Sequence, residues 1–153
     1  MPLNRACIGR TYPPTRVFEV GREHIRQFAQ AIGDDNPAYV DPVHARALGH
    51  PDVVAPPTFL MTVVSAAGGR DALADPELGL DRRRVVHAEQ RFTAHRPVHP
   101  GDRLVLTTTI DDIADRGDNE VLSLRHDIGT ESGEPVCSAW FVITSRGTAA
   151  KPA

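Results

Sequence analysis

The feature that most constrains the fold is an apolar segment followed by a long run of alternating residues. Residues 53–67 are mostly apolar, but Pro56, Pro57 and three hydroxyl residues interrupt them, so the segment is too short and too broken to span a bilayer. Within 57–67 the apolar residues lie nearly all round a helix, and Gly68 and Gly69 follow. This pattern predicts a helix that is buried on all sides in the core of the protein.

From residue 85 onward the pattern is that of β-strands. Leu104, Leu106 and Ile110 alternate with more polar positions, which is typical of an antiparallel strand with one buried face. Turn residues at 100–102, 116–119 and 131–134 separate four expected strands, at 85–98, 103–113, 120–129 and 134–146. Residues 136–143 are apolar on both faces, so the last strand is expected in the interior of the sheet.

The part of the chain before residue 57 indicates helices. Apolar residues at positions 25, 28, 29 and 32 predict an amphipathic helix over 22–32 that ends at Gly33, and Asp41 caps a second, short helix through about residue 48. A weaker alternation at 15–20 predicts a short strand before them. A buried helix followed by an antiparallel meander predicts an α+β fold in which the sheet wraps around the helix. We expect one domain over residues 1–146 and a disordered tail at 147–153.

Composition and charge exclude several kinds of partner. The net charge is −3, from 17 Lys and Arg against 20 Asp and Glu, so nucleic acid is not expected as the main partner. The basic cluster at 82–84, beside Asp81, is either a solvated loop or a docking patch for an acidic carrier or a phosphate. Residues 1–10 lack the apolar core of a signal peptide, and no segment has the length of a membrane span, which predicts a cytoplasmic protein.

The two cysteines and seven histidines do not follow a metal-binding or disulfide pattern. Cys7 and Cys137 lie far apart without a CxxC spacing, and the apolar alternation around Cys137 indicates a buried small hydrophobic residue. The histidines show neither HxH nor HExxH spacing. We therefore expect no disulfide framework and no bound metal.

Residues 33–37 read Gly-Asp-Asp-Asn-Pro and carry the clearest chemical signal. They place Asp34 just past the end of the first predicted helix, on a loop that Pro37 stiffens by fixing its own φ and restricting Asn36 to extended backbone. Such a loop either holds an acid beside a pocket or only ends a helix with an Asx turn. Spacing alone leaves both interpretations open.

The residues around this loop resemble a family signature. Phe28, Gly33, Asp34, Asn36 and Pro37 match the G-D-x-N-P-x-H signature of the MaoC-like, (R)-specific enoyl hydratase family, and a short helix follows as it does there. The resemblance implies a hot-dog fold, in which an antiparallel sheet wraps around a central helix, and a substrate that is an acyl thioester. It also implies that Asp34 stands at the position of the family's catalytic Asp.

Tyr39 stands where the family has its catalytic His. Dehydration removes a proton from C2 of a 3-hydroxyacyl thioester while the C3 hydroxyl leaves, and a Tyr with a pKa near 10 is a poor base at neutral pH. Tyr39 is therefore expected to donate a hydrogen bond or to line an acyl tunnel. His44 and His50 lie nearby, neither at the family's spacing, and either is an alternative source of the base.

A second block resembles the non-catalytic half of double-hot-dog hydratases. Residues 86–92, 96–98 and 101–102 are similar to the H-G-E-Q strand and the following Lys-Pro and Gly-Asp turn of that half, which holds the acyl tail. The chain as a whole resembles the A-type subunit, with a FAS1-like dehydratase domain, of actinobacterial 3-hydroxyacyl-carrier-protein dehydratases. This implies a separate catalytic partner. His87 is then a substrate-binding candidate, although a His in such a strand also serves as a structural hydrogen-bond partner.

The turn that opens the buried helix is the remaining candidate. Pro57, Thr58 and Phe59 lie at a predicted helix N-terminus, whose free amides either stabilise an enolate-like oxygen or only begin a core helix. Because Pro57 has no N–H, the donors would begin at Thr58.

Three functions follow from these residues. The first is a subunit of a (3R)-hydroxyacyl thioester dehydratase or enoyl hydratase in fatty-acid metabolism, with Asp34, Asn36 and Tyr39 at the site and a catalytic hot-dog partner. The second is a self-sufficient homodimeric hydratase with a displaced His, and the third a non-enzymatic acyl-thioester binding or scaffolding protein. The resemblance implies acyl-carrier protein or coenzyme A as the thiol carrier and no other cofactor.

Overall fold

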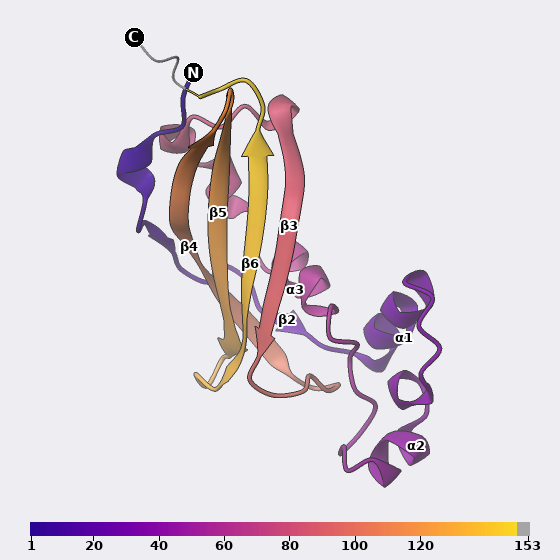
Figure 1. The fold of residues 1–153 in the computed structure, drawn as a ribbon. Helices are drawn as coiled ribbons and strands as arrows, with labels where there is room; N and C mark the ends of the chain where they lie inside the picture. Colours follow the sequence, from indigo (N-terminus) through magenta and orange to yellow (C-terminus); the bar gives the residue numbers. More distant parts are fainter. Residues whose placement is uncertain (150–153) are drawn as a thin grey trace.

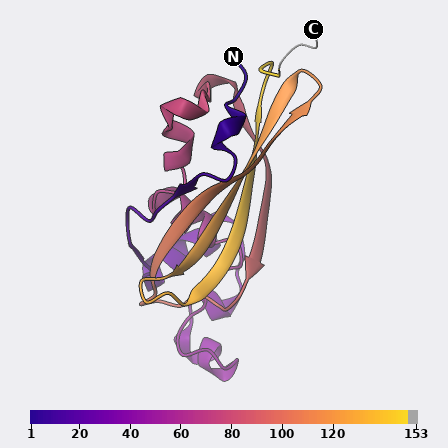
Figure 2. The same cartoon turned by 90° about the vertical axis from the view of Figure 1, so that its left-hand side faces the viewer.

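The computed structural model describes residues 1–149, which form one antiparallel sheet with helices against one face and beyond one end (Figures 1 and 2). Its four long strands are β3 (Val85–Ala94), β4 (Arg103–Arg116), β5 (Asn119–Thr130) and β6 (Pro135–Ser145). Two short strands, β1 (Thr11–Tyr12) and β2 (Phe18–Glu19), both pair with β4. The strand order is β1-β4-β5-β6-β3, so β6 has neighbours on both sides, which confirms its interior position.

The alternation in β4 positions its apolar side chains against the helices. Leu104, Leu106 and Ile110 are buried, as predicted. A bulge between Ile110 and Asp112 then shifts the register by one residue, so that Ile113 is buried as well. The strand thereby keeps one apolar face along its whole length.

The α-helices are α1 (Arg22–Ala31), α2 (Pro42–Ala47) and α3 (Leu60–Ala66). Of the short 3₁₀ turns, η2 (Pro37–Tyr39) connects α1 to α2, while the others precede α1 or follow α3: η1 (Arg5–Cys7), η3 (Asp71–Ala74), η4 (Pro76–Leu78) and η5 (Arg82–Arg84). The Asp41 carboxylate accepts a hydrogen bond from the Val43 amide at 2.8 Å and caps α2 as expected.

The predicted core helix differs from α3 in two respects. The observed helix α3 begins at Leu60 rather than at Pro57, because residues 56–59 form a turn in which the Phe59 amide donates to the Pro56 carbonyl at 2.9 Å. It is also not buried on all sides: Ser65 and Ala66 are exposed, since the sheet covers only one side of the helix (Figure 2).

The predicted strand at 85–98 likewise ends earlier, at Ala94. Residues 95–102 form the β3–β4 loop. The Ala55 amide, before α3, donates to the Val98 carbonyl of this loop at 2.9 Å. The segment before α3 and the loop before β4 are therefore held together at one end of the sheet.

The segment expected to fray from residue 147 is attached as far as the structure describes it. The Gly147 amide donates to the Asn119 side chain at 3.0 Å, the Ala149 amide donates to the Asp118 carbonyl at 3.2 Å, and Thr148 is buried between them. Residues 150–153 of the predicted tail lie outside the described residues.

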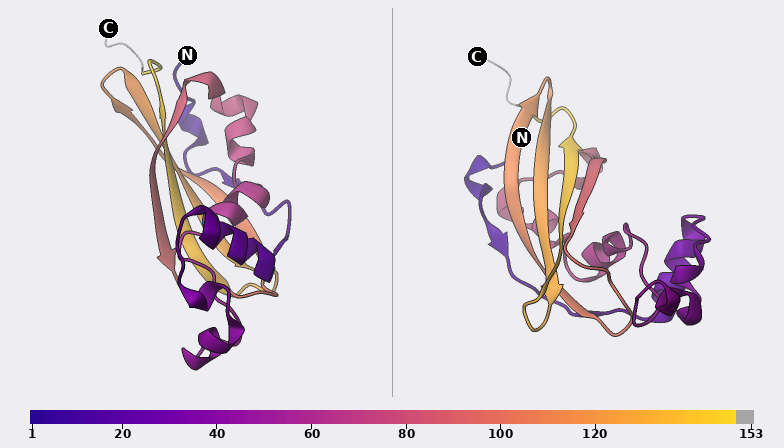
Figure 3. Two further views of the ribbon diagram at one scale, coloured as in Figure 1. Left: turned by 90° about the vertical axis from the view of Figure 1, so that its right-hand side faces the viewer. Right: turned by 60° about the horizontal axis from the view of Figure 1, so that its bottom comes forward.

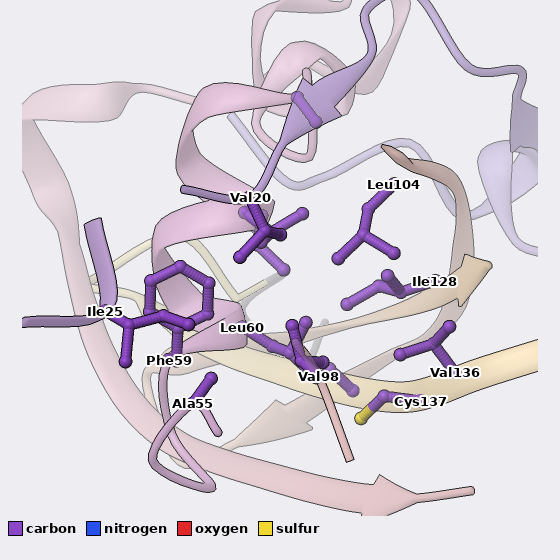
Figure 4. Packing of buried hydrophobic residues seen from close by; sticks show 14 of the residues in the cluster. Val20, Ile25, Ala55, Phe59, Leu60, Val98, Leu104, Ile128, Val136 and Cys137 are labelled. Atoms are coloured by element: carbon purple, nitrogen blue, oxygen red, sulfur yellow. The ribbon is translucent and has the colours of Figure 1, made fainter. Parts of the chain in front are cut away.

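The core consists of two adjoining clusters between the helices and the sheet. Phe59 lies at the centre of the larger one, wholly buried, and Cys137 is buried in it as predicted. Figure 4 shows how side chains from residues 20–60 meet side chains of the β3–β4 loop, β4, β5 and β6: Val20, Ile25, Ala55, Phe59, Leu60, Val98, Leu104, Ile128, Val136 and Cys137.

The helices α1 and α2 extend beyond the end of the sheet as a separate lobe, while α3 lies against the sheet itself (Figure 3). The lobe reaches the sheet end at which β3 stops and the β3–β4 loop begins (Figure 1). The Gly-Asp-Asn-Pro loop belongs to this lobe, so the fold brings it to the end of the sheet.

Candidate active site

Asp34 is fixed by the way α1 ends. Gly33 has φ +70°, its amide donates to Gln30, and the Asp34 amide donates to the Ala29 carbonyl at 3.0 Å. These two bonds form a Schellman motif, which requires the left-handed conformation that glycine adopts at little cost. The backbone of Asp34 is thus tied to the last turn of the helix.

Asn36 and Tyr39 follow from the same local chemistry. The Asp34 carboxylate accepts from the Asn36 amide at 3.2 Å, and the Asn36 side chain accepts from the Ala38 amide at 3.0 Å. The second bond caps η2, whose first residue is Pro37. The short turn ends at Tyr39, which is only 8% exposed.

A cavity of about 520 Å³ opens between the helical lobe and the sheet end. Its walls come from η2, the residue after α2, the turn before α3 and the β3–β4 loop. The lining residues are Asn36, Ala38, Tyr39, Leu48, His50, Val54, Ala55, Pro56, Pro57, Leu60, Ala94, His95, Arg96, Pro97 and Val98. Of the site residues predicted from the sequence, Asn36, Tyr39 and Pro57 line it, and so does His50, one of the two alternative bases.

Tyr39 has the electrostatic surroundings of a hydrogen-bond donor. Burial raises the pKa of its hydroxyl above the ordinary value near 10, and the negative charge of Asp34 raises that pKa further. The phenol therefore stays protonated at neutral pH. It can donate a hydrogen bond into the cavity, but it cannot serve there as a base.

Asp34 itself lines a neighbouring hollow of about 460 Å³. The residues around this hollow belong to α1 and the following loop: Arg26, Ala29, Gln30, Gly33, Asp34, Asp35, Asn36 and Val40. Asn36 lines both spaces, so the loop forms the wall between them. The carboxylate of Asp34 thus acts on the larger cavity through its charge on Tyr39.

Thr58 and Phe59 lie apart from the cavity lining. Phe59 is wholly buried and packs edge to face against Phe28, with ring centroids 5.7 Å apart. Thr58 is exposed, and within residues 1–149 its amide donates no hydrogen bond. The amides of Phe59 and Met61 are used inside the turn, by Pro56 and Thr58.

His87 lies at the opposite end of β3 from the cavity. Its ring stacks on Phe141 with centroids 4.3 Å apart, and its Nε2 is 3.1 Å from the Glu89 carbonyl oxygen. The bulge between His87 and Glu89 brings these groups together. These contacts suit a structural hydrogen-bond partner. His87 does not line the cavity, where the predicted substrate-binding role would require it.

The structure distinguishes the two histidines predicted as alternative bases and adds His99 beside one of them. His50 lines the cavity, whereas His44 is exposed on α2 and does not. His50 Nδ1 is 3.2 Å from His99 Nε2, on the β3–β4 loop. His50 was one of the two histidines predicted as an alternative source of the base, but nothing in the local sequence links it to a histidine 49 residues away.

Arg96 and Asp102 brace the β3–β4 loop. Two nitrogens of the Arg96 guanidinium donate to the Asp102 carboxylate, at 2.9 and 3.0 Å, and Asp102 also accepts from the His99 amide at 3.0 Å. Both charged side chains are less than a quarter exposed. A bidentate ion pair of this kind fixes the geometry of the loop. Part of the cavity wall is therefore rigid.

Neither a metal site nor a membrane-spanning helix is present among residues 1–149. None of these residues form a group of three or more His, Cys, Asp or Glu side chains able to hold a metal ion. In the same range, no helix has the length and apolar character needed to cross a membrane.

The fold and the cavity define the class of protein: an antiparallel sheet around a helix, with the MaoC-like motif loop at its end, is the hot-dog architecture of dehydratases and hydratases. Residues 6–139 match the family described as "FAS1-like, dehydratase domain region", and the chain belongs to it. A UPF0336 protein of Saccharopolyspora erythraea is 51% identical over 153 residues, covering 99% of this chain and 97% of that protein.

Two solved structures of hot-dog complexes are similar to this chain. One is the HadBC (3R)-hydroxyacyl-ACP dehydratase complex from Mycobacterium tuberculosis, with 29% identity, a TM-score of 0.78, and 90% of this chain and 96% of that chain covered. The other is the ChsH1–ChsH2 complex from the same organism, with 25% identity, a TM-score of 0.77, and 95% and 92% covered. Both are assemblies of two different chains.

Proposed function

We propose that this chain is a subunit of a (3R)-hydroxyacyl thioester dehydratase or enoyl hydratase of fatty-acid metabolism, which binds the acyl chain and pairs with a catalytic hot-dog partner. The observation that carries the proposal is Tyr39, which lines the cavity at the position of the motif histidine. Its raised pKa keeps it a donor. The full rate of dehydration then requires a base from the partner's own motif.

The cavity walls match an acyl thioester. Val54, Ala55, Leu60 and Val98 offer apolar surface for the acyl chain, while Asn36, Tyr39, His50 and Arg96 gather polar groups on the same lining. Acyl-carrier protein or coenzyme A would present the thioester, without a metal or redox cofactor. Both carriers work inside the cell, and we accordingly assign the protein to the cytoplasm.

Strand β3 supports the pairing with a second hot dog. It ends the strand order of the sheet, so its outer edge has no neighbour within residues 1–149. An edge strand of ten residues with unpaired backbone groups is a template for another strand. The two-chain assemblies of HadBC and ChsH1–ChsH2 are consistent with such a partner.

The test compares crotonyl-CoA hydration by this chain alone, by a hot-dog chain that retains the motif histidine, and by the two co-expressed. We expect the two chains to co-purify and the pair to exceed the sum of the separate rates. Robust hydration by this chain alone that survives both Tyr39→Phe and Asp34→Asn would contradict the proposal, as would a failure to co-purify with any chain that keeps the histidine.

The position of His50 favours a second candidate, the self-sufficient homodimeric hydratase. His50 lines the same cavity as Tyr39, and an imidazole nitrogen can accept a proton from a substrate carbon. Full-rate hydration by the chain alone, lost on substitution of His50, would favour this candidate over the subunit.

A further inference from the structure

One face of the sheet has no helix over it within residues 1–149, as Figure 2 shows. Side chains alternate between the two faces of a strand, so the buried Phe141 points to the helices and its neighbours Trp140 and Val142 point the other way. We call this surface, which also carries Val121 of β5, the outer face. A sheet face that meets only water is usually polar, and a Trp and two Val side chains are more apolar surface than a single chain needs there.

The register of β3 and β6 arranges the outer face in two rows. Glu89 pairs with Val142, and Arg91 pairs with Trp140. Two residues along a strand return to the same face about 7 Å further on, so an acidic and apolar row lies directly beside a basic and aromatic row. The guanidinium of Arg91 stacks on the Trp140 ring, 4.1 Å from its centroid, which defines the second row.

Glu89 and Arg91 are the free charges of these rows. Both are exposed, and within residues 1–149 neither has an ion-pair partner. Asp112 and Arg116 are also unpaired in this range, but they lie on β4, three strands from β3. Three further charges beside the rows pair within the chain: Arg125 with Asp111 and Asp127.

A two-fold axis that crosses the strands at the level of Gln90 exchanges the two rows. In a second copy stacked on the outer face, Arg91 then lies opposite Glu89, and Trp140 lies opposite Val142. Stacked sheets lie about 10 Å apart, a distance that two facing side chains can bridge. The outer face is therefore complementary to itself in charge, as the interface of a symmetric pair must be.

Two shallow hollows on the outer face give the indole ring of a second copy a place to pack. Their volumes are about 250 and 220 Å³. Val121 and Val142 line both hollows, and Ala114 lines the smaller one. Because Trp140 of the second copy would lie opposite Val142, its ring meets these apolar walls.

From this arrangement we infer that the outer face binds the outer face of a second copy of this chain, with the two sheets back to back. The inference goes beyond the proposed function and does not depend on which chain pairs with β3.

Back-to-back stacking is compatible with pairing at the edge of the sheet. Antiparallel pairing of β3 over its full length centres on the middle of this ten-residue strand, between Glu89 and Gln90. This is within one residue of the axis that exchanges the two rows. Two-fold axes that meet at one point define a closed assembly of four chains, so edge pairing and stacking can form together.

Trp140 is the only tryptophan of the sequence, so its fluorescence reports on the outer face alone. Acrylamide quenching and the emission maximum are measured on the full-length protein over a dilution series, in parallel with sedimentation velocity. We expect association to shift the emission to the blue and to reduce quenching, because stacking covers the indole. Association that leaves both signals unchanged, or a monomer at every concentration, would overturn the inference. In the first case the edge of β3 alone associates, and the proposed function stands.

Exchange of the two free charges tests the contact itself. Arg91→Glu places two acids opposite each other and Glu89→Arg two arginines, so each should weaken the association that protects Trp140 by about tenfold. The double variant restores opposite charges and should recover most of the affinity. Arg82→Glu, on the exposed turn η5, is the matched control and should associate as the wild type does. Wild-type association in both single variants, or a double variant as weak as the singles with unchanged thermal unfolding, would overturn the inference.

Discussion

Tyr39 lies at the position that carries a histidine in the G-D-x-N-P-x-H motif. Asp34 lies close enough for its charge to raise the pKa of the phenol, and the capping bond from Ala38 to Asn36 fixes the turn on which Tyr39 lies. Pro37 begins that turn. Within the motif G-D-x-N-P-x-H this chain therefore differs at one side chain, and under the proposed function that difference replaces a base with a donor.

Tyr39→His should therefore raise the rate of crotonyl-CoA hydration by the chain alone, because an imidazole replaces a phenol that stays protonated. General bases contribute about 10²–10⁴-fold, so partial recovery is measurable. Adding Asp34→Asn should abolish the gain. An unchanged rate in Tyr39→His would mean that the pocket has diverged beyond this residue, which strengthens the acyl-binding role.

His126 gives a prediction about stability at the same scale. It is fully buried on β5, Thr108 Oγ1 lies 2.9 Å from its Nδ1, and Nε2 has no partner within residues 1–149. Burial lowers its pKa to about 4, and the nearby Asp127 opposes this only in part. The folded protein therefore resists protonation of this ring, which the unfolded chain accepts near pH 6.5.

Stability should then fall as the pH drops from about 6.5 toward 4, since the unfolded state binds the proton first. The contribution is on the order of 3 kcal/mol across this window. Urea unfolding at pH 7, 5 and 4 should show a smaller loss for His126→Gln than for the wild type. Equal losses in both proteins would exclude His126 as the source.

At the scale of elements, local signals were sufficient where a single residue fixes the backbone. The ends of α1 and α2 were predicted because Gly33, Gly49 and the Asp41 cap act through bonds to their immediate neighbours. The start of α3 was misplaced because Pro56 and Pro57 suit a tight turn as well as a helix start. The His50–His99 contact had no local signal, because only the packing of the lobe against the β3–β4 loop creates it.

The packing of α3 against the sheet can be tested by substitutions of buried and exposed residues. Phe59 and Leu60 are buried in the main cluster, so Phe59→Ala and Leu60→Ala should each lower the free energy of unfolding by about 2–5 kcal/mol. Ser65→Ala, on the exposed side of the same helix, is the matched control and should stay within about 0.5 kcal/mol. Urea unfolding measures all three. Losses below roughly 1 kcal/mol at both buried positions would contradict the packing of α3 against the sheet.

At the scale of the whole molecule, the single chain is incomplete along one edge. β3 has β6 on one side and no strand on the other within residues 1–149. On this strand, the side-chain amide of Gln90 is buried, yet neither its oxygen nor its nitrogen has a partner. A buried polar group without a partner costs about 1–3 kcal/mol. A second hot dog beside β3 would pair the free edge.

We therefore predict that the isolated chain is at least a dimer at micromolar concentration, as sedimentation velocity will measure. Antiparallel pairing of two β3 strands would make the sheet continuous across the two copies and protect the free edge from further association. A clean monomer at all concentrations would contradict self-association. In that case the free edge of β3 belongs to a different chain, and the same sedimentation experiment, repeated with the co-expressed catalytic hot dog, should show a single heterodimer.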